Sequence, residues 1–161
     1  MRTPSLLLCL ALVAPLSAAC GKKRVRPANL SEESKEQQLL SDSARLYWEA
    51  LRWADSERAG AFIEDQQQRV LYRDWMEEHA EQHKLEDAQV LQVILGDELD
   101  PPVDGRLQTA SVFVRTKGYS YPAQIVETAR VEQKWFRSVN GWFVDWSIPD
   151  EADDAEGGGW R

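Results

Sequence analysis

Apolar residues recur at intervals of three and four along the first part of the folded region, which predicts an amphipathic helix. The predicted stripe consists of Leu40, Ala44, Tyr47, Leu51 and Ala54. Trp48 flanks this stripe and Trp53 lies outside it. Ser41 or Ser43 is suited to cap the start of the helix, because serine side chains accept hydrogen bonds from free amides of the first turn.

Two further helices are expected before the pattern changes. Asp55 ends the first helix and caps a short second one from Ser56 to Ile63, whose inward positions are Ala59, Phe62 and Ile63. A third helix fits Gln67 to about His83. Its apolar positions with helical spacing are Val70, Leu71, Trp75, Met76 and either His79 or Ala80.

The second half alternates with a period of two, which is typical of half-buried strands. Gln89 to Leu95 is the first expected strand, with Leu91, Val93 and Leu95 on one face. The segment 96–106 holds two prolines, two glycines and three aspartates, so we expect a loop. The strand that follows, Arg106 to Thr116, places Ala110, Val112 and Val114 on one face.

A turn at 117–122 precedes a long strand from Ala123 to Arg137. One of its faces carries Ile125, Glu127, Ala129, Val131, Gln133 and Trp135. Asn140-Gly141 is a strong hairpin signal, and Trp142 to Trp146 closes the sheet with Trp142, Val144 and Trp146 on one side. Helices followed by an antiparallel meander are an α+β arrangement, here with N-terminal helices packed on a strongly curved antiparallel sheet.

The first twenty residues have the order of an export signal: a positive charge at Arg2, an apolar run from Leu6 to Leu16, and small residues. The junction Leu16-Ser17-Ala18-Ala19-Cys20, followed by Gly21, resembles that of bacterial lipoproteins. The resemblance implies that Cys20 carries lipid and anchors the chain in a membrane. Because Gly21 is not aspartate, it also implies the outer membrane, facing the periplasm. The alternative is ordinary cleavage after Ala19, which gives a soluble periplasmic protein.

The chain is therefore divided into a signal peptide at 1–19, a lipidated cysteine with a tether at 20–40, one folded domain at 41–148, and an acidic disordered tail at 149–161. Its 161 residues include 19 Lys and Arg against 27 Asp and Glu, a net charge of −8. Nucleic-acid binding is not expected, because a duplex binder needs a basic surface. Seven tryptophans are a large number for this length, and the six from Trp48 to Trp146 are expected to dominate the core.

The folded region resembles the nuclear transport factor 2-like superfamily. The residues concerned are Tyr47-Trp48-Glu49-Ala50-Leu51, the short helix after Asp55, the Trp75 helix, and the strands ending at Trp135 and at 140–145. The resemblance implies a cone, in which a curved sheet wraps around helices with a pocket at the open end. It also implies homodimerisation through the outer face of the sheet, as many relatives show.

Polar groups on the more apolar face of the long strand indicate a ligand site. The predicted pocket consists of Tyr47, Trp75, Glu127, Gln133 and Trp135. In the competing interpretation, a strand end or a bulge places Glu127 and Gln133 in water. If Glu127 is buried, burial raises its pKa and makes it a candidate base.

His79 and His83 are four residues apart, a spacing that can chelate one metal ion on a helix. No third ligand is identifiable, so a solvated helix face is the expected role, and no metal or cofactor is predicted. We expect a membrane-anchored, non-enzymatic periplasmic domain that binds a small apolar ligand or a protein. The alternative is an isomerase or hydro-lyase that uses a buried carboxylate at Glu127.

Overall fold

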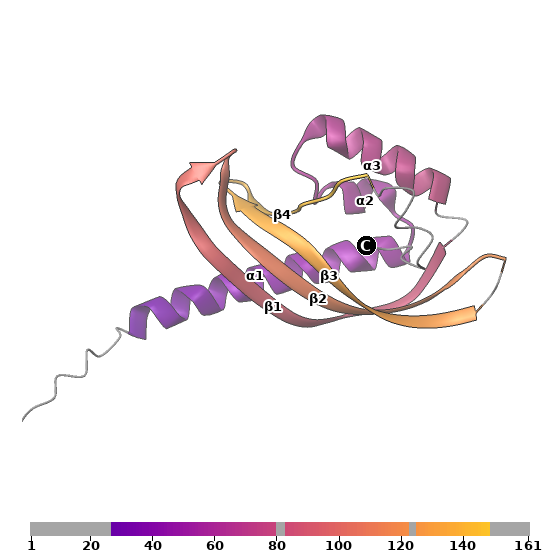
Figure 1. Cartoon of the computed structure of the whole chain (residues 1–161), viewed down its shortest axis with the longest axis horizontal. Coiled ribbons are helices and arrows are strands. Elements are labelled where there is room, and N and C mark those ends of the chain that lie inside the picture. Colours follow the sequence, from indigo (N-terminus) through magenta and orange to yellow (C-terminus); the bar gives the residue numbers. More distant parts are fainter. Residues whose placement is uncertain (1–26, 80–82, 123–124, 149–161) are drawn as a thin grey trace, which may run out of the picture.

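The computed structural model describes residues 27–79, 83–122 and 125–148, with side chains described from Glu32 onward. Helices α1 (Pro27–Arg52), α2 (Ser56–Gly60) and α3 (Gln66–His79) precede strands β1 (His83–Val103), β2 (Arg106–Ser120), β3 (Ile125–Ser138) and β4 (Gly141–Val144). The strands form one antiparallel sheet in the order β1-β2-β3-β4. The predicted α+β class, with helices followed by an antiparallel sheet, is confirmed. The sheet is bent but open, and all three helices lie on its concave side (Figure 1).

Helix α1 is longer than the stripe predicts, because it begins at Pro27, inside the segment expected to be a tether. Leu40, Ala44, Tyr47 and Leu51 are buried as predicted, and Trp48 is buried with them. Trp53 is exposed, also as predicted. Ala54 is exposed instead of inward, since its φ of +52° takes it out of the helix. No helix of the described residues is long and apolar enough to cross a membrane.

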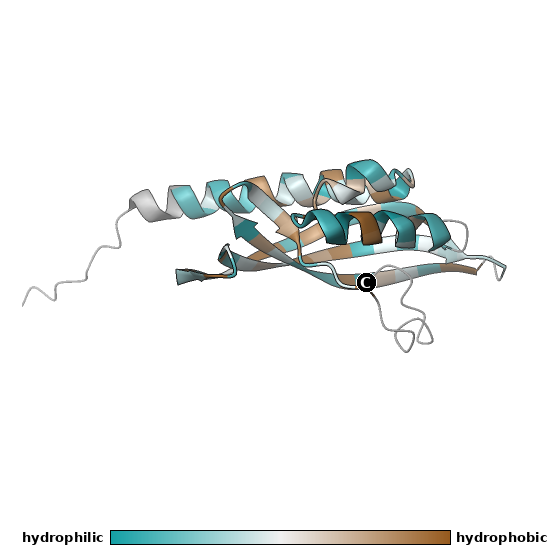
Figure 2. Cartoon of the chain, turned by 90° about the horizontal axis from the view of Figure 1, so that it is seen from above, coloured by the Kyte–Doolittle hydropathy of each residue, from teal (hydrophilic) through white to brown (hydrophobic). Residues whose placement is uncertain are grey.

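Helices α2 and α3 each begin after an aspartate whose side chain caps the helix start. Asp55 Oδ1 accepts a hydrogen bond from the Arg58 amide at 2.9 Å, and Asp65 Oδ1 accepts one from the Gln68 amide at 2.8 Å. The inner face of α3 differs from the prediction, because Tyr72 and Met76 are buried while Val70 and Leu71 are exposed. In Figure 2, α3 is mostly hydrophilic around one hydrophobic stretch, as expected of a helix that buries a single narrow face.

Strand β1 continues through the segment predicted to be a loop, with prolines 101 and 102 near its end. Proline is compatible with this position because β1 is an edge strand. The turn is confined to Asp104 and Gly105, whose φ values of +50° and +77° suit a two-residue hairpin. Register shifts at Glu86 and Leu91 reverse the alternation, so that Leu91 is exposed and, contrary to the prediction, does not share the core-facing side with Val93 and Leu95.

Strands β2, β3 and β4 follow the predicted pattern more closely. Ala110, Val112 and Val114 are buried on one face of β2, and the β2–β3 register runs without a shift. The hairpin predicted at Asn140-Gly141 joins β3 to β4, where Ser138 pairs with Gly141. Trp142, Val144 and Trp146 are buried on one side as predicted. The outer edge of β4 is bonded to the loop after α2, where the Val144 amide donates to the Phe62 carbonyl at 2.9 Å.

Aromatic rings fill the space between the helices and the concave face. Tyr47 meets Trp48, Phe62 and Trp135 edge to face, with centroid separations between 5.9 and 6.0 Å. Tyr72 meets Trp146 in the same way at 5.1 Å. Edge-to-face pairs place the positive ring edge against a negative ring face and add to the stabilisation from buried area. These contacts hold α1 and α3 over one part of the sheet and frame the cavity described below.

Candidate functional site

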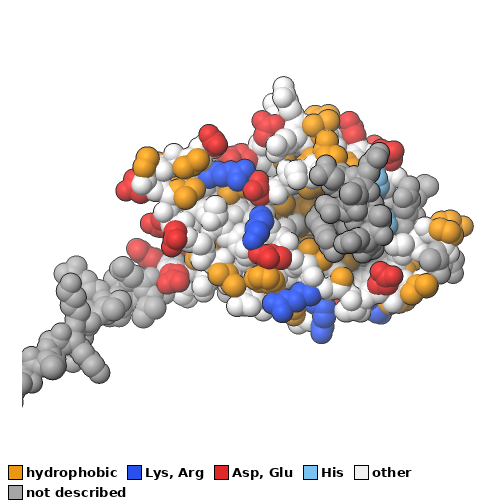
Figure 3. Space-filling model, viewed as in Figure 1, with side chains coloured by type: hydrophobic (Ala, Val, Ile, Leu, Met, Phe, Trp, Pro, Cys, Tyr) orange, Lys and Arg blue, Asp and Glu red, His pale blue; other side chains and the backbone are white. Residues whose placement is uncertain are grey.

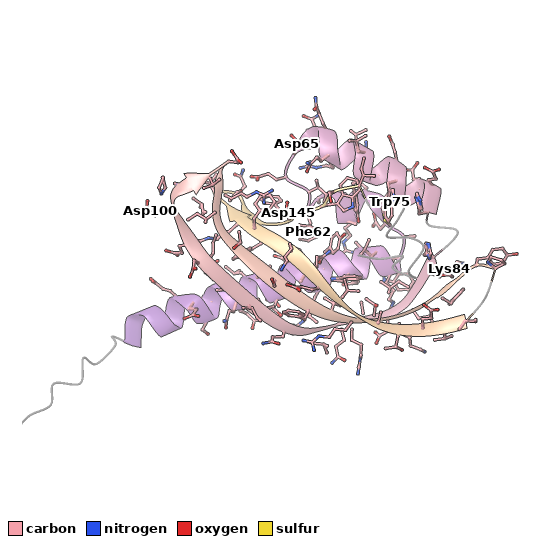
Figure 4. All side chains as sticks on the ribbon, viewed as in Figure 1. Phe62, Asp65, Trp75, Lys84, Asp100 and Asp145 are labelled. Carbon is pink, nitrogen blue, oxygen red and sulfur yellow. The ribbon has the colours of Figure 1, made fainter. Side chains whose placement is uncertain are left out.

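A cavity of about 170 Å³ opens where β4 ends and the chain leaves the sheet. Helix α1 contributes Tyr47, Trp48 and Leu51, and α3 contributes Tyr72, Trp75 and Met76. The remaining lining comes from the two segments that diverge at the sheet edge: Glu132, Gln133 and Lys134 of β3, and residues 144–147. In Figure 4, the labelled Trp75 and Asp145 lie on the concave side, where α3 faces the end of β4. We call this cavity the aromatic pocket.

The side chain of Gln133 is the polar centre of the pocket wall. Its Oε1 atom accepts one hydrogen bond from Trp48 Nε1 at 3.1 Å and another from Trp135 Nε1 at 3.0 Å. Gln133 therefore satisfies the indole donors of two nearly buried tryptophans, whose exposed fractions are 2% and 1%. Such satisfaction matters because a buried donor without a partner costs about 1–3 kcal/mol.

Two tyrosine hydroxyls form a second polar group in the pocket. The Tyr72 hydroxyl donates to the Tyr47 hydroxyl at 3.2 Å. Burial raises the pKa of Tyr47 to about 12, although the Tyr72 and Gln133 side chains act in the opposite direction. Burial also raises the pKa of Tyr72, and the neighbouring Tyr47 adds to this effect. Both hydroxyls are therefore protonated at neutral pH, so they act as hydrogen-bonding groups and not as bases.

The charged residues that line the pocket are ion-paired. Lys134 Nζ donates to Glu132, and hydrogen bonding from Lys134 lowers the pKa of the Glu132 carboxyl. Asp145 forms a bidentate pair with Arg106, with N–O distances of 2.8 and 3.0 Å. Both pairs are exposed, so the pocket presents aromatic and amide groups and no unpaired charge from these residues.

Three of the five predicted pocket residues come together here: Tyr47, Trp75 and Gln133 line the cavity. Trp135 does not line it but lies directly beneath, bonded to Gln133 and packed edge to face on Tyr47. Its indole is 1% exposed. It therefore supports the pocket as part of the core.

Glu127 does not join the predicted pocket. It is exposed and lies six residues from Gln133 on the same face of β3, a separation of about 20 Å along a strand. Residues 125–130 of β3 are all exposed, whereas Val131 and Trp135 are buried. The strand runs past the part of the sheet that the helices cover, so its first half is in water. This agrees with the competing interpretation for Glu127 but not for Gln133.

The sequence interpretation missed Tyr72 and Trp146 as pocket residues. Tyr72 is three residues before Trp75 and four before Met76, so helical spacing could have placed it on the inner face of α3. Trp146 alternates with Trp142 and Val144 and was assigned correctly to the core side. The pattern could not show that the chain separates from β3 after Val144. This separation opens the cavity between the two segments.

His79 and His83 are placed in different elements, at the end of α3 and the start of β1. The His79 ring stacks on Trp75 at 4.6 Å, and its Nδ1 donates to the Trp75 carbonyl at 2.7 Å. His83 Nδ1 lies 3.0 Å from Ser120 Oγ. Within residues 27–79, 83–122 and 125–148, no group of three or more His, Cys, Asp or Glu side chains is arranged to hold a metal ion.

The predicted lipid-attachment residue, Cys20, lies outside the described residues, as do the signal peptide and the acidic tail. Cleavage of the signal peptide, lipidation of Cys20 and location at the outer membrane therefore remain predictions. The predicted domain at 41–148 covers most of the described fold but omits the first half of α1.

No protein-family model matches the chain, and no curated protein matches it. Among solved structures, the chain is similar to the solution structure of a SEC-C motif containing protein from Rhodopseudomonas palustris. The sequence identity is 12% and the TM-score 0.44, over 64% of this chain and 73% of that one. A similarity of this size supports no argument about function.

These findings correct the family resemblances drawn from the sequence. No family model supports an assignment to the bacterial lipoproteins or to the nuclear transport factor 2-like superfamily. The sheet is also open, with four strands in simple meander order. The resemblances rested on a short junction and on the order of elements and aromatic residues. The order of elements and aromatic residues recurs in unrelated helix-then-meander proteins, because it follows from periodicity and packing alone.

Proposed function

We propose that this domain is a non-enzymatic binding module whose aromatic pocket receives one compact apolar or aromatic group. The single observation that supports this most directly is the aromatic pocket itself. An apolar cavity of about 150 Å³ is large enough to bind benzene, and this pocket measures about 170 Å³. Apart from the ion-paired residues at its rim and Ser147, the side chains of its lining offer two neutral tyrosine hydroxyls and one amide, which suit a ring with a single hydrogen-bonding atom.

The state of the polar groups favours binding over catalysis. The two carboxylates that line the pocket, those of Glu132 and Asp145, are each paired with a cation at the rim. The tyrosines are protonated, because burial raises their pKa values. The alternative interpretation, an isomerase or hydro-lyase, requires a buried carboxylate at Glu127. That residue is exposed and lies outside the pocket. The binding interpretation needs only the pocket.

Indole is a suitable probe because it is planar, neutral and has one hydrogen-bond donor. We expect calorimetric or NMR titration to show saturable indole binding, with shifts confined to Tyr47, Tyr72, Trp75 and their neighbours. Ser147→Trp should abolish binding, because Ser147 lines the pocket from an exposed position and a larger side chain there would fill the mouth.

Ser34→Trp is the matched control, since Ser34 is exposed on α1 and does not line the pocket. It should bind indole as the natural chain does. Equal binding by both tryptophan variants, or absence of binding by the natural chain, would refute the proposed function.

A further inference from the structure

Strand β3 has a free edge next to the aromatic pocket. On one side it pairs with β2 along its whole length, from Ile125 to Arg137. On the other side β4 covers only residues 135–138, and the Asp145 amide adds one bond to the Lys134 carbonyl at 2.9 Å. Among the described residues, nothing pairs with β3 from 125 to 133 on that side. The free edge ends at Glu132 and Gln133, where the pocket begins.

The direction of the free backbone groups follows from the ladder. The Lys134 carbonyl points toward the β4 side, and in an antiparallel strand alternate residues present both N–H and C=O to the same side. Because the β2–β3 register has no shift, Thr128, Arg130 and Glu132 present their backbone groups to the free edge. These three residues are exposed.

The two edges of the sheet differ in how well they are protected against pairing with a strand from another chain. The β1 edge carries prolines 101 and 102 and several register shifts, features that oppose pairing with another strand. The β3 edge from 125 to 133 has no proline and no bulge. An unprotected regular edge is a template for strand addition.

The charge beside this edge is positive on the convex face, although the chain is acidic overall. Arg130 lies directly across from Arg115 in the β2–β3 ladder, a like-charge pairing that costs stability unless an anion is nearby. Arg115 donates to Gln89, and the Arg130 guanidinium lies 4.9 Å from the centre of the Phe113 ring. Among the described residues, neither arginine forms a salt bridge, and the nearby carboxylate of Glu132, whose pKa Arg130 helps to lower, is itself paired with Lys134. In Figure 3, Lys and Arg side chains gather along the convex side of the sheet.

We propose that the free edge of β3 binds an extended peptide by strand addition, with one acidic side chain of the peptide beside Arg130 and one aromatic side chain in the aromatic pocket. This rests on the proposed function of the pocket. The peptide backbone would bond to Thr128, Arg130 and Glu132. A residue opposite Gln133 faces the pocket side, and a residue opposite Arg130 faces the convex side, because side chains alternate. The partner therefore has an aromatic residue and an acidic residue three positions apart.

The register defines a test peptide. For antiparallel addition, the sequence Trp-Lys-Val-Glu-Val-Thr places Trp opposite Gln133, Lys opposite Glu132 and Glu opposite Arg130. A second peptide replaces this Glu by Lys and keeps every other residue. A third replaces Trp by Ala. Each is labelled at its end with a fluorophore and titrated with the natural chain by fluorescence anisotropy.

We expect the Glu peptide to bind and the Lys peptide to bind about five to ten times more weakly, the size of a favourable surface charge pair replaced by a repulsive one. Arg130→Glu should reverse this preference. Arg58→Glu makes the same charge change on α2, away from the edge, and should leave the preference unchanged. Loss of binding by the Ala peptide would place the aromatic side chain in the pocket.

Hydrogen exchange gives a readout specific to strand addition. The Thr128, Arg130 and Glu132 amides should become protected on binding, whereas the intervening amides of β3 already bond to β2. Unchanged exchange at these three amides, or no reversal of preference in Arg130→Glu, would overturn the inference. Indole binding without peptide binding would overturn it too and leave the proposed function standing, whereas failure of indole would refute the proposed function first.

Discussion

The indole of Trp48 on α1 and the amide of Gln133 on β3 are joined by a 3.1 Å hydrogen bond across 85 residues of sequence. The same Gln133 oxygen accepts from Trp135 at 3.0 Å. One side chain therefore fastens the longest helix to the third strand and fixes the orientation of two tryptophans behind the pocket. Gln133 is partly accessible at the pocket wall, so the same residue serves the core and the site.

Gln133→Leu should destabilise the fold by about 2–4 kcal/mol, since it leaves two buried indole donors without an acceptor. Chemical denaturation monitored by tryptophan fluorescence measures the change. Gln92→Leu is the control, because Gln92 is exposed on β1 and its change should stay within about 0.5 kcal/mol. Similar denaturation midpoints for the two variants would show that the Trp48 and Trp135 donors find other partners.

The buried tyrosine pair predicts a loss of stability in alkali. The pKa of Tyr47 is raised to about 12 in the folded chain, above its value of 10.0 in the unfolded one. The stabilisation is therefore complete below pH 10 and is lost as the pH rises through about 12. A shift of this size corresponds to about 2–3 kcal/mol. Denaturation at a series of alkaline pH values, with phenolate absorbance recorded in parallel, measures it.

Tyr47→Phe separates this effect from general alkaline unfolding. The variant loses an acceptor for the Tyr72 hydroxyl, so we expect it to be less stable at neutral pH. Its stability should also fall less steeply between pH 10 and 12. An identical slope in both proteins would mean that other groups dominate the alkaline transition.

The sequence was most informative where one face of an element is uniformly buried. The stripe through Tyr47 on α1 and the alternation through Val112 on β2 were predicted correctly, because burial imposes a period on the sequence. The hairpin at Asn140-Gly141 was predicted for a different reason, since its backbone conformation favours these residue types. Local rules were therefore sufficient to give the α+β class and half of the helix boundaries.

The site was harder to predict because it depends on where elements end relative to one another. Gln133 and Glu127 have the same parity on β3, and only the extent of the helical cover separates them. Tyr72 lines the pocket because α3 packs through the face of Tyr72 and Met76. The prediction had instead used Val70 and Leu71 to define the inner face. A single-residue bulge in β1 reversed the face of Leu91, and no local pattern specifies such a bulge.

The bulge leads to a direct prediction for two leucines of β1. Leu91→Gln should change the free energy of unfolding by no more than about 0.5 kcal/mol, because Leu91 is the extra residue at the register shift and is exposed. Leu95→Gln should cost about 1–2 kcal/mol, since Leu95 packs against the core. Urea denaturation of both variants measures the difference. Equal costs would mean that the register shift lies elsewhere.

Gly118 on β2 and Gly60 on α2 predict opposite responses to the same substitution. A Cβ atom on Gly118 would lie 2.5 Å from the backbone oxygen of Lys84, so the β1–β2 ladder would have to move. Because no side-chain rotation can relieve a contact with backbone, we expect Gly118→Ala to destabilise the fold by about 1–3 kcal/mol.

Gly60→Ala is the matched control, because its nearest contact is the flexible Arg69 side chain at 3.4 Å and its position is helical. Alanine has less conformational freedom than glycine in the unfolded chain, so this variant should be unchanged or up to about 1 kcal/mol more stable. Thermal unfolding by circular dichroism measures both. A Gly118→Ala protein as stable as Gly60→Ala would contradict the close β1–β2 approach at Lys84, and with it the register that places Gly118 opposite Leu85.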